Sequence, residues 1–236
     1  MTIKAIIFDV DGTLADTEDA HRIAFNTAFA ENNLDWNWDV ALYDKLLKVT
    51  GGKERIKYFV ESFLPDFSKP ADYDRFVKNL HLVKTSHYTT MLRNGLIPLR
   101  PGIKQLITEA HRTGITLAIA TTTTPENVSA LLEVGLGTNW EKYFSVNGCG
   151  DIVPNKKPAP DIYHWVLREL KLSPAECIAL EDSNNGLRSA LAAGIKTYVT
   201  INPYTCTQDF TGAEAVFDDL SDLPRFYKVI GVEVVS

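Results

Sequence analysis

Four short polar clusters in this chain combine carboxylates, hydroxyls and a lysine next to predicted strands and helices. They are Asp9 with Asp11, Thr121–Thr124, Lys156–Pro158 and Glu181–Ser183. Carboxylates in this number suit Mg²⁺, which takes hard oxygen ligands and keeps some waters. A lysine and a hydroxyl beside the metal would hold the remaining oxygens of a phosphoryl group. Phosphoryl transfer needs mainly positioning and charge neutralisation, so the clusters predict metal-assisted phosphoryl transfer.

The two aspartates of the first cluster could divide the reaction between them. One carboxylate can act as the nucleophile and form an aspartyl-phosphate. The other, two residues away, can act as general acid and then as general base.

Each cluster also has an ordinary structural interpretation. An Asp-x-Asp-Gly sequence can simply end a strand in a turn, and a threonine run can cap the next helix. Lys156 with Lys157 can be a solvated pair, and Glu181 with Asp182 can stabilise a helix N-terminus. The functional interpretation is favoured because all four clusters would meet at one edge of the predicted sheet.

The predicted elements explain why the clusters should meet. Residues 5–8 form an apolar run without alternation, which is typical of a strand buried on both faces of a parallel sheet. Further strands are expected at 115–120, 144–146, 177–180, 195–201 and 215–217, alternating with helices at 125–134, 160–170 and 184–193. This alternation indicates an α/β fold, and the carboxyl ends of parallel strands share one edge where ligands bind.

A strand-poor insertion follows the first strand. Apolar spacing predicts helices at 17–32, 39–49, 53–64 and 71–92, and then at 102–113. We therefore expect a Rossmann-like parallel sheet core (residues 1–15 and 97–236) with an inserted small helical cap domain (residues 16–96). Residues 229–235 fit either a strand or an apolar tail.

Net charge, hydropathy and cysteine spacing limit the classes of binding partner and the location that we expect for this protein. The formal net charge of −6 argues against broad capture of nucleic acid or of an anionic membrane, and no apolar run approaches the roughly 18 residues that span a bilayer. No signal peptide is visible, and the three cysteines share no Cys-x-x-Cys spacing, so we expect a cytoplasmic protein with reduced thiols. We also expect a monomer, because no long exposed apolar stripe is evident.

The clusters resemble, in order and spacing, the four motifs of the haloacid dehalogenase superfamily of phosphatases and mutases. The matching residues are Asp9-x-Asp11-Gly12-Thr13, Thr121, Lys157 before Pro158-Ala159-Pro160-Asp161, and Glu181-Asp182. The resemblance implies that Asp9 is nucleophile and metal ligand, and that Asp11 is the acid/base whose backbone carbonyl binds the metal. It also implies that Thr121 and Lys157 hold the phosphoryl group, and that Asp182, with Glu181 nearby, completes the Mg²⁺ shell.

The insertion resembles the cap of the β-phosphoglucomutase-like branch and, within it, the CbbY-type subgroup. The residues that carry this resemblance are Glu18, His21, Trp36, Trp38, Thr50–Ile56 and Leu99–Gly102. That subgroup is associated with dephosphorylating xylulose-1,5-bisphosphate to xylulose 5-phosphate. Expected substrate contacts are Glu18, His21, Tyr43, Thr50, Gly51, Gly52, Lys53, Arg55 and Thr122.

The cap residues by themselves agree with a second phosphate site. Gly51 and Gly52 permit close approach of backbone to ligand, and Lys53 and Arg55 add two cations to an otherwise acidic protein. The alternatives are that these cations are solvated, that His21 lies on a helix surface, that Glu18 is a first-turn acid, and that Tyr43 packs within the cap. His81 and the remaining histidines show no ligand spacing and are expected to be structural or exposed.

Together with the resemblance, the sequence thus predicts a Mg²⁺-dependent sugar-bisphosphate phosphatase with a mobile cap. A sugar phosphomutase with the same core is the first alternative. A non-catalytic phosphometabolite sensor that kept the binding site is the second.

Overall fold

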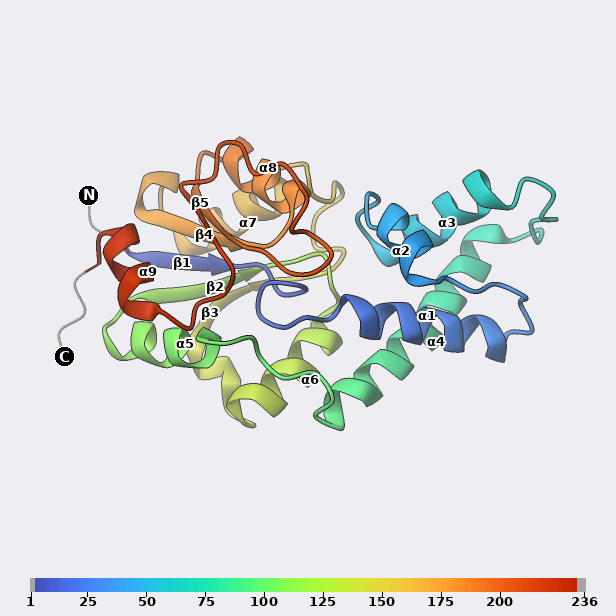
Figure 1. Cartoon of the computed structure of the whole chain (residues 1–236), viewed down its shortest axis with the longest axis horizontal. Helices are drawn as coiled ribbons and strands as arrows, with labels where there is room; N and C mark the ends of the chain where they lie inside the picture. The colour runs from blue at the N-terminus through green and yellow to red at the C-terminus, as the bar shows by residue number, and fades with distance from the viewer. Residues whose placement is uncertain (1–2, 233–236) are drawn as a thin grey trace.

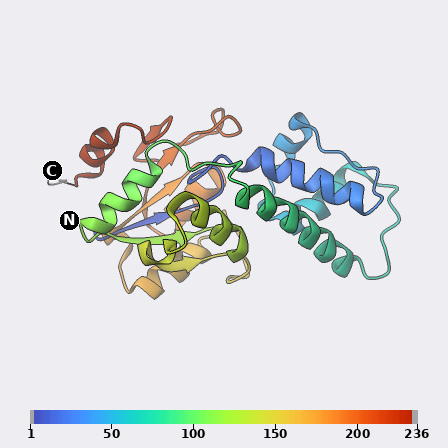
Figure 2. The same ribbon diagram turned by 90° about the horizontal axis from the view of Figure 1, so that it is seen from below.

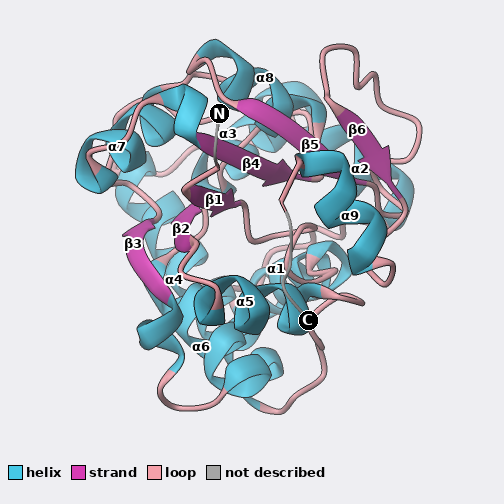
Figure 3. Cartoon of the chain, turned by 90° about the vertical axis from the view of Figure 1, so that its left-hand side faces the viewer, coloured by secondary structure: helices cyan, strands magenta, loops and turns pink. Residues whose placement is uncertain are grey.

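A single parallel sheet forms the centre of the molecule (Figures 1 and 3). This computed structural model describes residues 3–232. The sheet has six strands in the order β3-β2-β1-β4-β5-β6. Their bounds are β1 (Ala5–Phe8), β2 (Thr116–Ala120), β3 (Phe144–Gly148), β4 (Cys177–Glu181), β5 (Lys196–Thr200) and β6 (Ala215–Phe217). The strand order reverses between β1 and β4, which is where ligands bind in doubly wound sheets.

Helices cover both faces of the sheet. On one face lie α5 (Ile103–Arg112), α6 (Pro125–Leu136) and α9 (Leu223–Ile230), and on the other α7 (Asp161–Leu170) and α8 (Asn184–Ala192). Figure 2 looks onto the α5 and α6 side. Ile6 and Phe8 of β1 enter the first apolar core, whereas Ala5 and Ile7 enter the second. Burial of every β1 side chain explains the unbroken apolar run, and the predicted α/β fold is confirmed.

The insertion after β1 forms a separate helical layer beyond the carboxyl edge of the sheet (Figure 1). It consists of α1 (Glu18–Glu31), α2 (Val40–Leu46), α3 (Gly52–Phe63) and α4 (Tyr73–Arg93). Its own core is aromatic: the Trp38 ring packs within 4.6 Å of Phe25 and 4.9 Å of Phe29 between centroids. We call this layer the cap; its predicted limits, residues 16–96, stay a prediction.

One helix, α9, was not predicted. Asp222 caps its N-terminus by accepting from the Arg225 amide, and Gly231 ends it in the left-handed conformation. Leu223, Phe226 and Ile230 repeat at helical spacing on its buried face, a signal that eight residues carry weakly. Of the segment left open as strand or tail, residues 229 and 230 are helical, and residues 233–235 lie outside the described residues.

Within the described part of the chain, no helix is long and apolar enough to cross a bilayer.

Candidate active site

The carboxyl ends of β1 and β4 bring three acids together. Phe8 pairs in register with Leu180, so Asp9 emerges beside Glu181 and one residue before Asp182. Oxygens of these three buried carboxylates all lie within 4.8 Å of one another. The sequence prediction that acids from distant motifs converge is therefore confirmed at this edge.

Lys157 holds two of the three acids. Its Nζ donates to Asp9 Oδ1 and to Glu181 Oε1, each at 2.6 Å, and Tyr163 Oη donates to the same Glu181 oxygen. Burial would lower the pKa of Lys157, but the two carboxylates raise it above its usual value. The lysine is therefore a fixed cation at the floor of the site.

One ammonium does not balance three buried carboxylates. Burial raises the pKa of Asp9 to about 8 despite the adjacent Lys157. Burial, with the charges of Asp9 and Glu181, also raises the pKa of Asp182 well above its usual value. In addition, Glu181 Oε2 is buried and has no hydrogen-bond partner among the described residues. An oxygen-rich cluster with surplus negative charge fits a hard divalent cation.

Gly12 and Asn202 complete the surroundings of Asp182. Asn202 Nδ2 donates to Asp182 Oδ2 at 2.7 Å. Gly12 has a left-handed φ of 83°, and a Cβ there would lie 2.1 Å from Asp182 Oδ2. Only glycine therefore lets the loop after Asp9 approach the acid cluster so closely.

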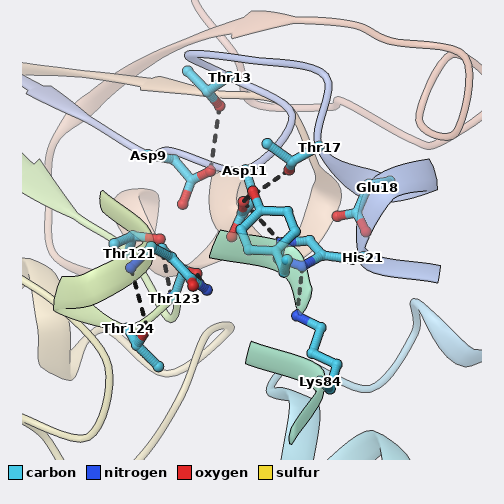
Figure 4. Close-up of polar contacts among 12 residues, drawn as sticks. Asp9, Asp11, Thr13, Thr17, Glu18, His21, Lys84, Thr121, Thr123 and Thr124 are labelled. Carbon is cyan, nitrogen blue, oxygen red and sulfur yellow. Dashed lines mark hydrogen bonds and ion pairs between the residues drawn. The ribbon is translucent and has the colours of Figure 1, made fainter. Parts of the chain in front are cut away.

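Asp11 points away from the acid cluster and toward the cap (Figure 4). Its Oδ1 accepts from Thr17 Oγ1 at 2.8 Å and lies 3.0 Å from His21 Nε2. Lys84 Nζ lies 2.5 Å from the other ring nitrogen of His21, Nδ1. Since an ammonium can only donate, Nδ1 accepts from Lys84 and Nε2–H donates to Asp11. Asp11, His21 and Lys84 thus form a chain of hydrogen bonds that crosses from β1 to the cap.

This chain of hydrogen bonds sets the charges around Asp11. Burial alone would raise the pKa of Asp11, but His21, Thr17 and the charge of Lys84 hold it below its usual range. Burial lowers the pKa of Lys84 to about 7. Burial and the charge of Lys84 lower the pKa of His21. These contacts therefore favour the carboxylate form of Asp11 over its protonated form.

The threonine run after β2 serves two purposes. Thr124 caps α6 by accepting from the Asn127 amide, which confirms the capping interpretation for this residue. Thr121 Oγ1 accepts from the Thr123 amide at 3.2 Å, and Thr123 Oγ1 accepts from Asn127 Nδ2 at 2.9 Å. The whole run also lines the cavity that contains Asp9.

A cavity of about 390 Å³ lies between the acid cluster and the cap. It is lined by most of the predicted site residues: Asp9, Asp11, Glu18, His21, Thr50, Gly51, Gly52, Arg55, Thr121, Thr122, Lys157, Glu181 and Asp182. Tyr43 is instead fully buried behind this wall, where its Oη donates to Glu18 and accepts from Arg55 Nη1 at 2.9 Å. Lys53 pairs with Asp151 of the core, at 2.5 Å between Nζ and Oδ2.

Sequence reasoning missed Lys84 and expected His81 to be structural or exposed. Both side chains line the cavity. Lys84 shares the buried face of α4 with Leu80 and Tyr88, and a lysine within an apolar helical stripe was the available signal. A Cβ on Gly52 would lie 2.5 Å from His81 Nε2, so this glycine makes room for the histidine.

Comparisons with known proteins agree with this geometry. The model of the haloacid dehalogenase-like hydrolase family matches residues 3–194. Protein CbbY (plasmid) of Cupriavidus necator is 49% identical over 220 residues, 93% of this chain and 87% of the relative. The crystal structure of CbbY from Rhodobacter sphaeroides in complex with phosphate is 45% identical, with a TM-score of 0.88 over 94% of this chain and 96% of that chain.

A second crystal structure of the Rhodobacter sphaeroides protein, an aspartate-to-asparagine variant in complex with xylulose-(1,5)bisphosphate, is similar to the same extent, with a TM-score of 0.88 and 45% identity over 94% of this chain and 96% of that chain. The resemblance first inferred from the motifs is confirmed by matches that span nearly the whole chain. The chain accordingly belongs to the haloacid dehalogenase-like hydrolases.

Proposed function

We propose that this enzyme is a Mg²⁺-dependent phosphatase of sugar bisphosphates that converts xylulose-1,5-bisphosphate to xylulose 5-phosphate. The observation that carries the proposal is the position of Asp9. Its carboxylate lies at the floor of a cavity, between Lys157 and the buried acids Glu181 and Asp182. The similar CbbY structure in complex with xylulose-(1,5)bisphosphate supports the choice of substrate.

The metal would be held by the carboxylates of Asp9 and Asp182, with Glu181 nearby and the backbone carbonyl of Asp11 as a further ligand. When bound, Mg²⁺ neutralises charge on the phosphoryl oxygens. Thr121 and Lys157 orient the phosphoryl group, and Lys157 keeps one oxygen of Asp9 in a fixed direction.

The reaction would proceed in two steps. A carboxylate oxygen of Asp9 attacks phosphorus, the bond to the sugar oxygen breaks, and that oxygen takes the proton that Asp11 kept from the water of the preceding turnover. Asp11, now a carboxylate, then takes a proton from the water that attacks the aspartyl-phosphate, which releases phosphate, frees Asp9 and returns Asp11 to its protonated form. The hydrogen bonds from Thr17 and His21, which favour the carboxylate form of Asp11, suit this second step.

The second phosphate would bind at the cap side of the cavity. Arg55 lines that wall, and its Nη1 already donates to Tyr43 Oη, so the guanidinium is held in place. The backbone amides at the N-terminus of α3 add a positive dipole end next to Gly51 and Gly52. Lys53 would first have to leave Asp151, so Arg55 is the principal cation for this phosphate.

A phosphate-release screen with Mg²⁺ tests the substrate. Xylulose-1,5-bisphosphate, fructose-1,6-bisphosphate and glucose phosphates are compared, and we expect the highest kcat/KM for the first. When the phosphoryl group of the substrate is isotopically labelled, the label should appear in free phosphate. Return of the label to the sugar would instead show a phosphomutase. If no phosphoester released phosphate, the non-catalytic sensor would be favoured.

Asp9→Asn tests the covalent route. We expect turnover to fall by at least about 1,000-fold because the amide is a poor nucleophile. Circular dichroism and thermal unfolding should show an intact fold, since the change removes one of three mutually repelling buried acids. Substantial remaining turnover in a folded variant would exclude Asp9 as nucleophile.

A further inference from the structure

The guanidinium of Arg100 joins three separate segments of the backbone. Its Nη1 donates to the carbonyl of Gly12 at 2.6 Å and to the carbonyl of Thr200 at 3.1 Å. Its Nη2 donates to the carbonyls of Ile201 and of Asp218, the latter at 2.9 Å. The side chain is only 6% exposed. A planar fork with several fixed donors is the group that can span such a set of acceptors.

Arg100 lies where the chain returns from the cap to the core. Its own amide donates to the Leu14 carbonyl at 2.8 Å, and Leu99 forms an antiparallel bridge with Ala15. The outgoing and returning linkers of the cap therefore meet at this residue. The following Gly102 is pressed against the core, since a Cβ there would lie 1.8 Å from the Leu220 carbonyl oxygen.

The bond to Gly12 connects Arg100 with the acid cluster. Gly12 directly follows Asp11, and its α-carbon faces the Asp182 carboxylate. Its amide donates to the Ala15 carbonyl at 2.8 Å, which closes a tight loop over residues 12–15. The backbone N–H and the carbonyl of Gly12 are therefore both hydrogen-bonded, the first to Ala15 and the second to Arg100.

The same loop is attached to the cap on its other side. The Asp11 side chain bonds to Thr17 and lies 3.0 Å from His21 of α1. The expected opening and closing of the cap would therefore pull on Asp11 through these contacts. A fixed Gly12 opposes that pull and keeps Asp9 and Asp11 aligned.

We propose that Arg100 is a positioning residue that holds the loop of residues 9–15 in its catalytic geometry while the cap moves. The inference rests on the proposed phosphatase function. Arg100 acts through the Gly12 carbonyl and is not among the described residues that line the catalytic cavity.

The ion pair of Arg100 is a separate feature. Arg100 Nε lies 3.3 Å from Asp16 Oδ1, and the Asp16 side chain is 57% exposed. Because the Asp16 carboxylate is largely solvated, its pair with Arg100 contributes little. Asp16→Asn is therefore a matched control that removes the charge partner and leaves the carbonyl contacts in place.

Arg100→Lys keeps the charge but replaces the fork with a single nitrogen. We expect kcat to fall by about 100-fold, the cost of a misplacement of roughly 1 Å, with KM changed less than about threefold. Asp16→Asn should keep both constants near the wild-type values. Hydrogen exchange of peptides covering residues 9–15, measured without metal or substrate, should accelerate in Arg100→Lys and not in Asp16→Asn.

A purely structural role would give a different result. Arg100→Lys would then unfold at a lower temperature, but kcat per folded molecule and exchange over residues 9–15 would match the wild type, which overturns the proposal. If Arg100→Lys does not fold, Thr200→Val removes one acceptor, Oγ1 at 3.1 Å from Nη1, and should show a smaller acceleration in the same peptides. If the wild-type enzyme releases no phosphate, the proposed function fails, whereas hydrogen exchange still tests Arg100.

Discussion

At the residue scale, the acid cluster depends on neighbours that carry no charge. The α-carbon of Gly12 faces Asp182, and a Cβ there would lie 2.1 Å from its carboxylate. The α-carbon of Gly186 faces Glu181, and a Cβ there would lie 1.8 Å from that carboxylate. Small residues are thus required here by close packing against acids, which is a stronger constraint than helix propensity.

Gly186→Ala tests this constraint. Gly186 lies in the first turn of α8, where alanine would ordinarily stabilise the helix by up to about 1 kcal/mol. We expect the opposite, because the added methyl group must displace Glu181: unfolding at a lower temperature, and a kcat reduced by at least about 10-fold. Gly135→Ala in α6 is the comparison, since its Cβ would meet the apolar side chain of Leu99, which can shift, and no hydrogen-bonded carboxylate. Equal stability changes in the two variants would contradict the prediction.

At the element scale, α4 carries a buried lysine into an aromatic environment. Lys84 Nζ lies 4.9 Å from the centroid of the Phe25 ring and 4.7 Å from that of Tyr88. The packing that places this lysine against His21 also penalises its charged form. Burial of Lys84 therefore lowers the stability of the folded protein, while its contact with His21 helps to orient Asp11.

The stability of the protein should depend on pH through Lys84. Because its pKa is lowered from 10.5 to about 7, the folded protein loses this proton at lower pH than the unfolded chain. The unfolded chain binds more protons between these values, so the Lys84 contribution to the free energy of unfolding rises with pH across this window. It is least favourable below pH 7 and improves toward pH 10.5.

Lys84→Met measures this contribution. Urea unfolding without metal gives the free energy of unfolding of the variant minus that of the wild type. We expect this difference to be more favourable to the variant at pH 7 than at pH 10, by on the order of 3 kcal/mol. Lys78→Met, at an exposed position of the same helix, should give a difference that does not vary in this way. A Lys84→Met difference that is constant with pH would show that the lysine is not buried as a charge.

At the scale of the whole molecule, cap and core are joined by an apolar base and a polar rim. Ala24 of α1 and Leu92 of α4 belong to the same apolar cluster as β1. Around the rim, Lys53 pairs with Asp151, and Asn185 Nδ2 donates to Thr50 Oγ1 at 3.1 Å. Polar rim contacts can exchange with water at low cost, which suits the opening that is expected of the cap.

Substitutions in the cap separate recognition of the second phosphate from contact with the core. Arg55→Ala should lower kcat/KM for the bisphosphate by more than about 10-fold, because a charge-assisted contact is lost. Its effect on a small monophosphoester should be much weaker. Lys53→Ala and Asp151→Asn should resemble each other on both substrates, since they break the same ion pair. A bisphosphate-specific loss in Lys53→Ala alone would show that Lys53 binds the second phosphate.

Much of this protein could be predicted from the sequence. The apolar run before Asp9 and the strand-helix alternation after residue 97 are local patterns, and parallel strands place their carboxyl ends at one edge. That rule alone was enough to predict that Asp9 and Asp182 meet. The tertiary structure decided the rest: the contact of Lys84 with His21, the pairing of Lys53 with Asp151, and the attachment of Arg100 to Gly12. These contacts join segments whose relative positions depend on how the helices of the cap and the linkers pack, and no local periodicity encodes such packing.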